Sequence, residues 1–420
     1  MKSLCKYMLV FAAMIVAYLL FGAGAYLMPD GAVQHHVRKT LENGDLSSDQ
    51  PRAILPNQLQ TRMDNFTDAI ILNQAYVMRI EGFGAGVLSV PRWWGAMLPF
   101  EVLRAGVEGQ ELEIWHYARY WHGNTFLTRY LLALMDYVSI RMFLYIVSSL
   151  LMLWCGVALW RRRGWRLAVP IVFSLLVCYA FVMQFSMQFA MVLILALAGM
   201  IALARRQTEN QASAMMAFFV VGSLTCYFDL LTAPMLTLGM MLVVQATLRP
   251  EDHPMKGWMQ TVCSALLWLA GYVGTWVAKW IIATLFTPEN VIADGWKNTL
   301  HRSGIADFSR WDAVMNNLEL LPWKFILLAV LIVSVLMVIR FNAKGWRRAV
   351  QILPIAFLPW VWYFFVADHS YWHNWFTFRV QAVSVAAVLL AMMQMVDWER
   401  RLPFSEKLEK LKLKYGKREI

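Results

Sequence analysis

Charge is scarce in this sequence: 15% of its 420 residues are Asp, Glu, Lys or Arg, whereas 59% are hydrophobic. Soluble domains carry about 25% charged and about 45–50% apolar residues, so this composition excludes an ordinary soluble protein. It also excludes a disordered chain, because disorder requires few large apolar side chains. Together with a mean hydropathy of +0.49, the shortage of charge indicates an integral membrane protein.

Cysteines and nucleotide-binding motifs are scarce as well. The five cysteines all lie within apolar stretches, and none belongs to a CxxC pair. This pattern excludes a disulfide framework and a zinc site of the common spacing. The sequence has no P-loop and no GxGxxG segment between a strand and a helix. We therefore expect neither a nucleotide-driven pump nor an enzyme that uses soluble nucleotide-sugars.

Long apolar runs are abundant, and their length of roughly 17–28 residues matches the hydrocarbon layer of a bilayer. They predict an all-α polytopic bundle of about ten spans, which forms a single transmembrane domain over residues 1–396. The first run resembles a signal peptide, but the many later runs favour an uncleaved helix. The expected spans are 8–28, 139–160, 167–183, 185–204, 213–228, 230–247, 259–286, 323–340, 349–366 and 377–396.

Basic residues predict the orientation in the membrane. The net charge of +11 comes mainly from Lys and Arg clusters in alternate loops, and such asymmetry marks the cytoplasmic side. Both termini are therefore expected inside, with 397–420 as a basic cytoplasmic tail, either bound to anionic lipid or solvated. The short loops and lysine-rich tail fit a bacterial inner membrane, and this distribution of charge indicates no nucleic-acid partner. The expected inner loops carry Arg161, Arg162, Arg163 and Arg166; Arg205 and Arg206; Arg249 and Lys256; and Arg340, Lys344, Arg347 and Arg348.

Two segments expected on the outer side, 29–136 and 287–322, are too long to be simple turns. Within the first, 64–79 and 115–134 mix apolar and polar residues in the way of helices that lie along a membrane surface. Glycine and proline between them, in 82–99, predict a loop.

An acidic pair lies in the first outer segment. Asp64 and Asp68 are four residues apart, so on a helix they share one face. Two close carboxylates raise each other's pKa, and one of them could then serve as a general base. The alternative is an N-terminal helix cap with a solvated acidic face, which the spacing favours about equally.

A cluster of aromatic residues with cations follows in the same outer segment. Arg119 and His122 are three residues apart among tryptophans and tyrosines, a mixture that suits a sugar or phosphate site. His116 lies six residues before His122, a spacing that argues against a zinc pair. The alternative is an interfacial aromatic belt with an arginine that reaches toward water.

A second such cluster precedes the last span. His369 and His373 have the spacing of a metalloprotease helix, but Ser370 stands where the catalytic Glu would be. With Arg379 they could instead hold a phosphate. An aromatic belt with incidental histidines is again the alternative.

Two isolated ions lie elsewhere near the outer ends of spans. Lys279 is within the seventh run, where it either extends its amine to the membrane surface or meets an anion. Asp229 lies in an outer turn, where it either caps the next helix or lines a cavity.

The overall plan resembles the GT-C class of glycosyltransferases: one N-terminal span, a large outer segment with helices and an acidic motif, and a bundle of further spans. Asp64 and Asp68 lie near the position of that motif, although they are separated by three residues rather than adjacent. The resemblance implies a polyprenyl-phosphate-linked sugar as donor and transfer on the outer face of the membrane. The acceptor would be a glycan, a lipid or a protein.

The chemistry of such a transfer fits the polar residues. Asp64, with Asp68 as second choice, is expected to take the proton of the acceptor hydroxyl. The scheme requires no cofactor or metal, although the aspartate pair could bind a divalent cation weakly. The leaving phosphate gains negative charge and needs cationic partners, for which the candidates are Arg119, His122, Lys279, His369, His373 and Arg379.

Two other functions fit a protein of this plan. A transporter or flippase of lipid-linked glycan is the main alternative, although transporters place charge at mid-bilayer on broken helices. A glycan polymerase or ligase is the third, and the early position of the largest outer segment argues against it.

Overall fold

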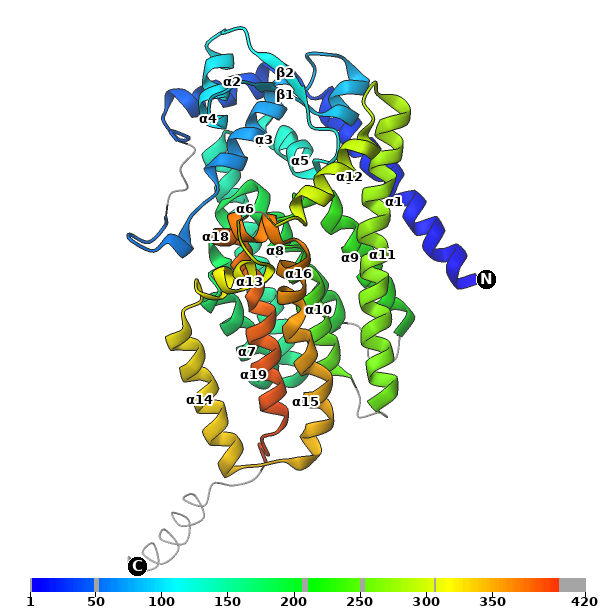
Figure 1. Ribbon diagram of the computed structural model, residues 1–420, viewed down its shortest axis with the longest axis vertical. Coiled ribbons are helices and arrows are strands. Elements are labelled where there is room, and N and C mark those ends of the chain that lie inside the picture. Colours follow the sequence, from blue (N-terminus) through cyan, green and yellow to red (C-terminus); the bar gives the residue numbers. More distant parts are fainter. Residues whose placement is uncertain (1, 49–52, 206–210, 250–253, 306, 400–420) are drawn as a thin grey trace, which may run out of the picture.

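The computed structural model describes residues 2–48, 53–205, 211–249, 254–305 and 307–399. It is an elongated helical bundle with a cap of shorter elements at one end (Figure 1). The first outer segment forms the cap. The fold is helical, as predicted, and among the described residues the one sheet is a two-stranded ribbon in the cap.

Six helical segments of the described chain are long and apolar enough to cross a membrane. They are α1 (Lys2–Leu27), α6 (Tyr137–Arg163), α8 (Met187–Arg205), α11 (Pro254–Phe286), Ala343–Phe365 with α15 (Trp346–Ile352) and α16 (Leu358–Phe365), and Asn374–Gln394 with α19 (Ala382–Gln394). A seventh forms if α13 (Arg310–Leu318) and α14 (Trp323–Ile339), which are bent by 78°, make one span.

Three shorter apolar helices occupy the remaining predicted runs: α7 (Trp165–Val177), α9 (Gln211–Phe228) and α10 (Pro234–Leu248). Each of the ten predicted runs is therefore helical. Only six or seven of them are long and apolar enough to be candidate spans, so the number ten stays a prediction.

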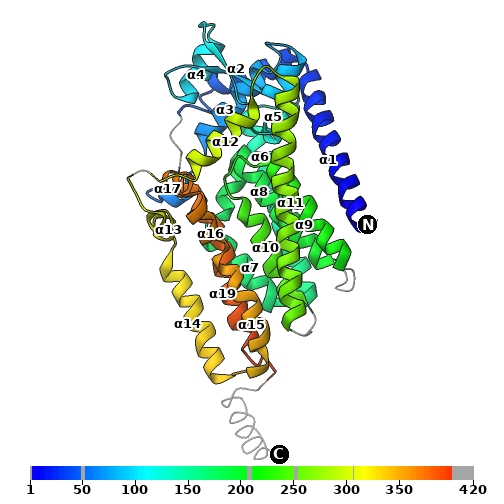
Figure 2. The same ribbon diagram turned by 45° about the vertical axis from the view of Figure 1, so that its right-hand side comes forward.

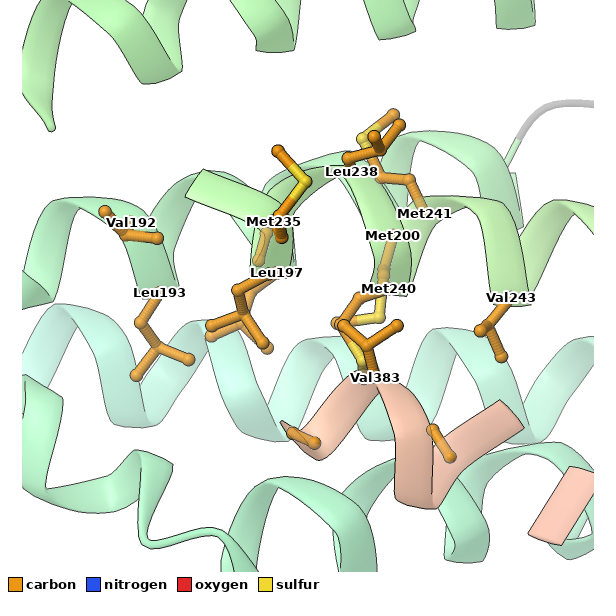
Figure 3. Close-up of a cluster of buried hydrophobic side chains, with 14 of the residues drawn as sticks. Val192, Leu193, Leu197, Met200, Met235, Leu238, Met240, Met241, Val243 and Val383 are labelled. Atoms are coloured by element: carbon orange, nitrogen blue, oxygen red, sulfur yellow. The ribbon is translucent and has the colours of Figure 1, made fainter. Parts of the chain in front are cut away.

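The centre of the bundle is an apolar core between α8, α10 and α19. Figure 3 shows Leu197, Met200, Met240 and Val383 gathered there, and all four are buried. The outer faces of the bundle are also apolar; Val338 on α14, for example, is 80% exposed. Continuous apolar surface of this kind is unfavourable in water, so these faces fit contact with lipid.

Helices α9 and α11 pack backbone against backbone through two glycines. A Cβ atom on Gly222 would lie 2.1 Å from the carbonyl oxygen of Trp268, and one on Gly271 would lie 2.2 Å from that of Phe219. Any larger residue would push the helices apart, as at the small-residue interfaces of other membrane helices.

The cap contains α2 (Asp30–Glu42), α3 (Asn65–Val77), the π-helical turn η2 (Ala85–Ser89), strand β1 (Pro91–Trp94), α4 (Pro99–Val107), strand β2 (Glu113–His116) and α5 (Gly123–Leu132). The strands pair antiparallel, with Pro91 opposite His116 and Trp94 opposite Glu113. The outer end of α11 rises to the level of the cap in both views (Figure 1, Figure 2).

Three expectations for the cap were wrong. The helix expected over 115–134 begins only at Gly123, because 113–116 pairs with β1 and His122 adopts φ +57°. The expected loop 82–99 contains η2 and β1. The helix expected over 64–79 exists as α3, but it is buried on nearly all sides and does not lie along a surface.

Arg129 of α5 joins the cap to the first span. Its buried guanidinium donates to the carbonyls of Ala25 and Met28 at the end of α1, to that of Ala75 in α3, and to the carboxylate of Asp30. A buried cation with four acceptors thus ties α5 to α1, α2 and α3 at one point.

Basic residues gather at the end of the bundle away from the cap. Arg163, Arg166, Lys344 and Arg348 line one cavity of about 630 Å³ there, between the ends of α6, α7, α15 and α19. The basic loops expected on one side of the membrane thus do lie together. Arg206, the side chain of Lys256 and the expected tail from residue 400 onward are outside the described residues.

Candidate functional site

An apolar cavity of about 390 Å³ lies near the cap, where α11 meets α12 (Val291–Arg302) and α16. Arg119 and Arg302 are the cations in its lining. The rest is largely aromatic or aliphatic, including Val273, Trp276, Val277, Trp280, Trp296 and Trp362. We call it the apolar cavity; it suits an apolar ligand with an anionic end.

Part of this wall is exposed at the surface of the bundle. Val273 and Val277 on α11 are 46% and 43% exposed, and Trp296 on α12 is 61% exposed. The cavity is therefore continuous with apolar surface on the outside of α11 and α12.

Arg302 is held by His369 but is not neutralised by it. Nη1 of Arg302 donates to Nδ1 of His369, so the ring proton is on Nε2, which donates to the carbonyl of Leu231 at 2.7 Å. Burial, with His373 and Arg302 nearby, holds the pKa of His369 well below its usual range. No carboxylate among the described residues pairs with Arg302.

Arg119 lies between two cavities. It lines the apolar cavity and also a second one of about 330 Å³ between α3, α4 and the β1–β2 ribbon. Its Nη1 is 3.1 Å from Oδ2 of Asp294, whose side chain is 47% exposed. We call the second space the aromatic cavity, because Phe66, Trp93, Trp94, Trp115 and Tyr117 line it.

Asp64 is a buried carboxylate with one oxygen unpaired. It caps α3: its Oδ1 accepts from the backbone N–H of Thr67 at 2.9 Å, while its Oδ2 has no partner among the described residues. Burial, and then the charge of Asp68, raise the pKa of Asp64 to about 6. A carboxyl group that titrates near neutral pH is suited to general-base chemistry.

Asp68 has a different environment one turn further along. Its carboxylate accepts from Arg141 at 2.8 Å, from the Tyr137 hydroxyl at 2.9 Å and from the backbone N–H of Met187 at 3.2 Å. These donors come from α6 and α8, so Asp68 joins the cap to the bundle. The alternative interpretation combined a helix cap with a solvated acidic face. The helix cap is present at Asp64, but the solvated face is wrong because both aspartates are buried.

Arg379 is anchored to the segment that leads into Asp64. Its Nη2 donates to the carbonyls of Gln60 and Arg62, at 3.1 and 3.0 Å, and its guanidinium lies 5.4 Å from the ring of Phe189. The residue is fully buried in spite of its charge.

An aromatic pair connects this cluster to Arg302. The Phe189 ring is 5.1 Å from that of Phe376, which in turn lies 5.9 Å from His369 and 5.3 Å from His373. Burial and the charge of Arg302 lower the pKa of His373 to about 4. Asp64 and Arg379 thus form one cluster, and His369, His373 and Arg119 belong to its neighbour around Arg302.

His122 and Lys279 contact backbone carbonyls. They line neither the apolar cavity nor the aromatic cavity. Nε2 of His122 lies 2.8 Å from the carbonyl of Tyr117, and burial lowers its pKa to about 3. Nζ of Lys279 donates to the carbonyl of Leu88 at 2.6 Å, and the side chain is completely buried. The amine therefore does not reach out to the membrane surface.

Asp229 caps the turn between α9 and α10, because its Oδ1 accepts from the backbone N–H of Thr232 at 2.9 Å. The aspartate pair is poorly suited to a cation, since Arg141 already occupies Asp68. Within the described residues no group of three or more His, Cys, Asp and Glu could hold a metal ion.

Three residues of the site were not predicted from the sequence: Arg92, Asp294 and Arg302. Arg92 lines the aromatic cavity, with its guanidinium over Trp115 and Tyr117. The signal in the sequence was the segment Pro-Arg-Trp-Trp, a cation next to two aromatic residues. Asp294 and Arg302 are on an amphipathic stretch of the second outer segment, which marks a helix but no particular ligand.

Comparison of the chain with protein-family models, with curated proteins and with solved structures finds no match.

Proposed function

We propose that this protein transfers a sugar from a polyprenyl-phosphate carrier to an acceptor on the cap side of the membrane, in the manner of the GT-C class. The observation that carries the proposal is the apolar cavity, whose wall is partly exposed at the surface of the bundle and whose cations are Arg119 and Arg302. Such a cavity suits the polyprenyl chain along the wall and its phosphate at the arginines.

In this scheme the acceptor oxygen forms a bond to the anomeric carbon of the sugar as the bond from that carbon to the phosphate oxygen breaks. The electron pair leaves on the lipid phosphate, and Arg119 and Arg302 stabilise the added charge. His369 orients Arg302 through Nδ1 without adding a charge of its own. The acceptor proton passes to a carboxylate.

Asp64 is the carboxylate that we propose as this base. Its unpaired Oδ2 and its pKa of about 6 favour the role. It is 1% exposed, so the scheme requires a movement of the surrounding chain that opens Asp64 to the acceptor. Asp294 is the alternative base, because it contacts the arginine that lines both cavities.

Membranes from cells that express the protein, given polyprenyl-phosphate sugars labelled in the sugar, test the proposal. We expect label to pass to an acceptor, and Arg302→Gln to lower the rate by about 10²–10³-fold, as for other groups that stabilise a transition-state charge. Lys297→Gln, an exposed neighbour on α12, is the matched control and should not change the rate.

Full transfer by Arg302→Gln, or no transfer by the native protein with any donor, would contradict the proposal. Movement of the intact donor across the membrane without transfer would favour the flippase instead. Comparison of Asp64→Asn with Asp294→Asn identifies the base, since only the true base variant loses the chemical step.

A further inference from the structure

We propose that the aromatic cavity is a binding site for a sugar that carries a carboxylate or phosphate group, and that Arg92 recognises the anion. The cavity, of about 330 Å³, lies between α3, α4 and the β1–β2 ribbon. This volume is at the small end of ligand cavities, which suits a single sugar rather than a lipid chain.

Arg92 is a buried cation without an anionic partner. Its side chain is 7% exposed, its Nε has no hydrogen-bond partner, and no carboxylate pairs with it among the described residues. The other buried arginine of the cap, Arg129, does have one, since it pairs with Asp30. A desolvated charge is costly unless an opposite charge meets it, so the unpaired Arg92 indicates a ligand anion.

Three aromatic rings hold the guanidinium in place. Its carbon lies 4.8 Å from the ring centre of Trp94, 4.7 Å from that of Trp115 and 5.5 Å from that of Tyr117. Cation–π contacts offset part of the cost of burial but bring no negative charge. Burial, together with the neighbouring Arg119, lowers the pKa of Arg92 to about 10, so the side chain stays charged at neutral pH.

The cavity is open at its rim and rigid at its base. Trp94, Met97 and Leu98 on the rim are 45%, 41% and 53% exposed. Behind them Asn73 fixes Trp93 with two hydrogen bonds, from Nδ2 to the carbonyl at 3.2 Å and from the backbone N–H to Oδ1 at 3.0 Å. A fixed aromatic wall offers stacking to the apolar face of a sugar ring.

The cavity also places its ligand next to the proposed lipid phosphate. Arg119 lines both cavities, so a sugar bound at Arg92 lies on the other side of Arg119 from the lipid carrier. The bound sugar would then be the acceptor, an assignment that rests on the proposed transfer. Binding of the anion does not rest on it.

Calorimetric titration of the purified full-length protein in detergent tests the binding without any donor. The ligands are glucuronic acid, glucose 6-phosphate, glucose and inorganic phosphate. We expect at least one of the two acidic sugars to bind at least tenfold more tightly than glucose and than inorganic phosphate. Comparison of the two acidic sugars shows whether the site prefers a carboxylate or a phosphate.

Arg92→Gln should weaken binding of the preferred acidic sugar at least tenfold and leave binding of glucose unchanged. Arg104→Gln is the matched control, because Arg104 is exposed on α4, pairs with Glu108 and does not line the cavity. Arg92→Lys, which keeps the charge but loses the planar fork, should bind with intermediate affinity. The melting temperature of Arg92→Lys shows whether this variant still folds.

Three results would overturn the proposal: no acidic sugar binds, glucose or inorganic phosphate binds as tightly, or Arg92→Gln and Arg92→Lys bind like the native protein. Failure of the transferase proposal would look different. The native protein would then bind the acidic sugar through Arg92 and show no transfer from any donor.

Discussion

At the scale of single residues, two carboxylates four positions apart have different environments. Within the part of the chain that the structure describes, Asp64 has an oxygen without a partner, whereas Asp68 accepts from Arg141, Tyr137 and Met187. A buried charge without compensation reduces stability, and a functional site is where such a cost is commonly found. We therefore expect their substitutions to have opposite effects on stability.

Asp64→Asn should abolish transfer without lowering the melting temperature at pH 7.5. In the folded protein the pKa of Asp64 is raised from 3.8 to about 6, so its ionised form costs on the order of 3 kcal/mol at pH 7.5. Asparagine removes that charge and still caps a helix. Activity measurements and thermal denaturation at pH 7.5 check both parts, and a large drop in melting temperature would contradict the second.

The pH dependence of the native protein follows from the same shift. Because the folded state binds this proton more tightly than the unfolded state, the contribution of Asp64 to stability is complete below about pH 4 and is lost as the pH rises through 6. Transfer should rise over the same interval, since the base acts when ionised. An Asp64→Asn variant whose stability varies with pH as the native protein's does would argue against this assignment.

Asp68→Asn should strongly destabilise the protein. It leaves the buried guanidinium of Arg141 without its counterion, and breaking a buried ion pair in this way costs about 3–5 kcal/mol. Thermal denaturation in detergent, compared with Asp64→Asn under the same conditions, measures the difference. Equal melting temperatures for the two variants would mean that Asp68 is not a structural residue.

At the scale of elements, α11 supports the proposed lipid site. It carries Trp276 and Trp280 of the apolar cavity and is held against α9 at Gly222 and Gly271. At these two glycines no side chain separates the backbones, so the position of α11 is set by how closely the two helices approach.

Gly271→Ala should destabilise the protein, whereas Gly274→Ala on the same helix should not. The new methyl group at 271 would lie 2.2 Å from the carbonyl oxygen of Phe219, and overpacking of this kind costs about 1–3 kcal/mol. At 274 the nearest atom is 3.5 Å away, in the ring of Phe11, and alanine favours the helix. Thermal denaturation of both variants checks the prediction, which fails if their melting temperatures shift alike.

At the scale of the whole molecule, the two ends differ in chemistry. The end away from the cap collects Arg163, Arg166, Lys344 and Arg348 around one cavity, whereas the cap end carries the aromatic cavity and the buried aspartates. The arrangement of basic residues follows the rule for cytoplasmic loops. It supports the prediction that the cap lies outside the cytoplasm.

Cysteine labelling of intact cells tests this orientation. Lys297→Cys on α12 and Arg347→Cys on α15 place exposed thiols at the two ends, in a chain whose accessible Cys5 and Cys263 are replaced by serine. A membrane-impermeant maleimide should label position 297 and leave 347 unlabelled until the cells are opened. The reverse pattern would put the proposed site in the cytoplasm.

The amino-acid sequence by itself determined the helical class, the positions of the apolar helices and the grouping of the basic loops, because hydrophobic length and charge are local properties. It also placed the start of α3 at Asp64, where a capping side chain precedes an apolar run.

The tertiary structure alone decided which polar residues meet. Asp68 finds its partners 73 residues away in Arg141 and 119 residues away in Met187, and Arg302 finds His369 67 residues away. Pairing with β1 likewise turned 113–116 into a strand. Contacts of this kind depend on how the helices pack, which no local pattern of residues encodes, and they decide which charges are satisfied and which are left for a ligand.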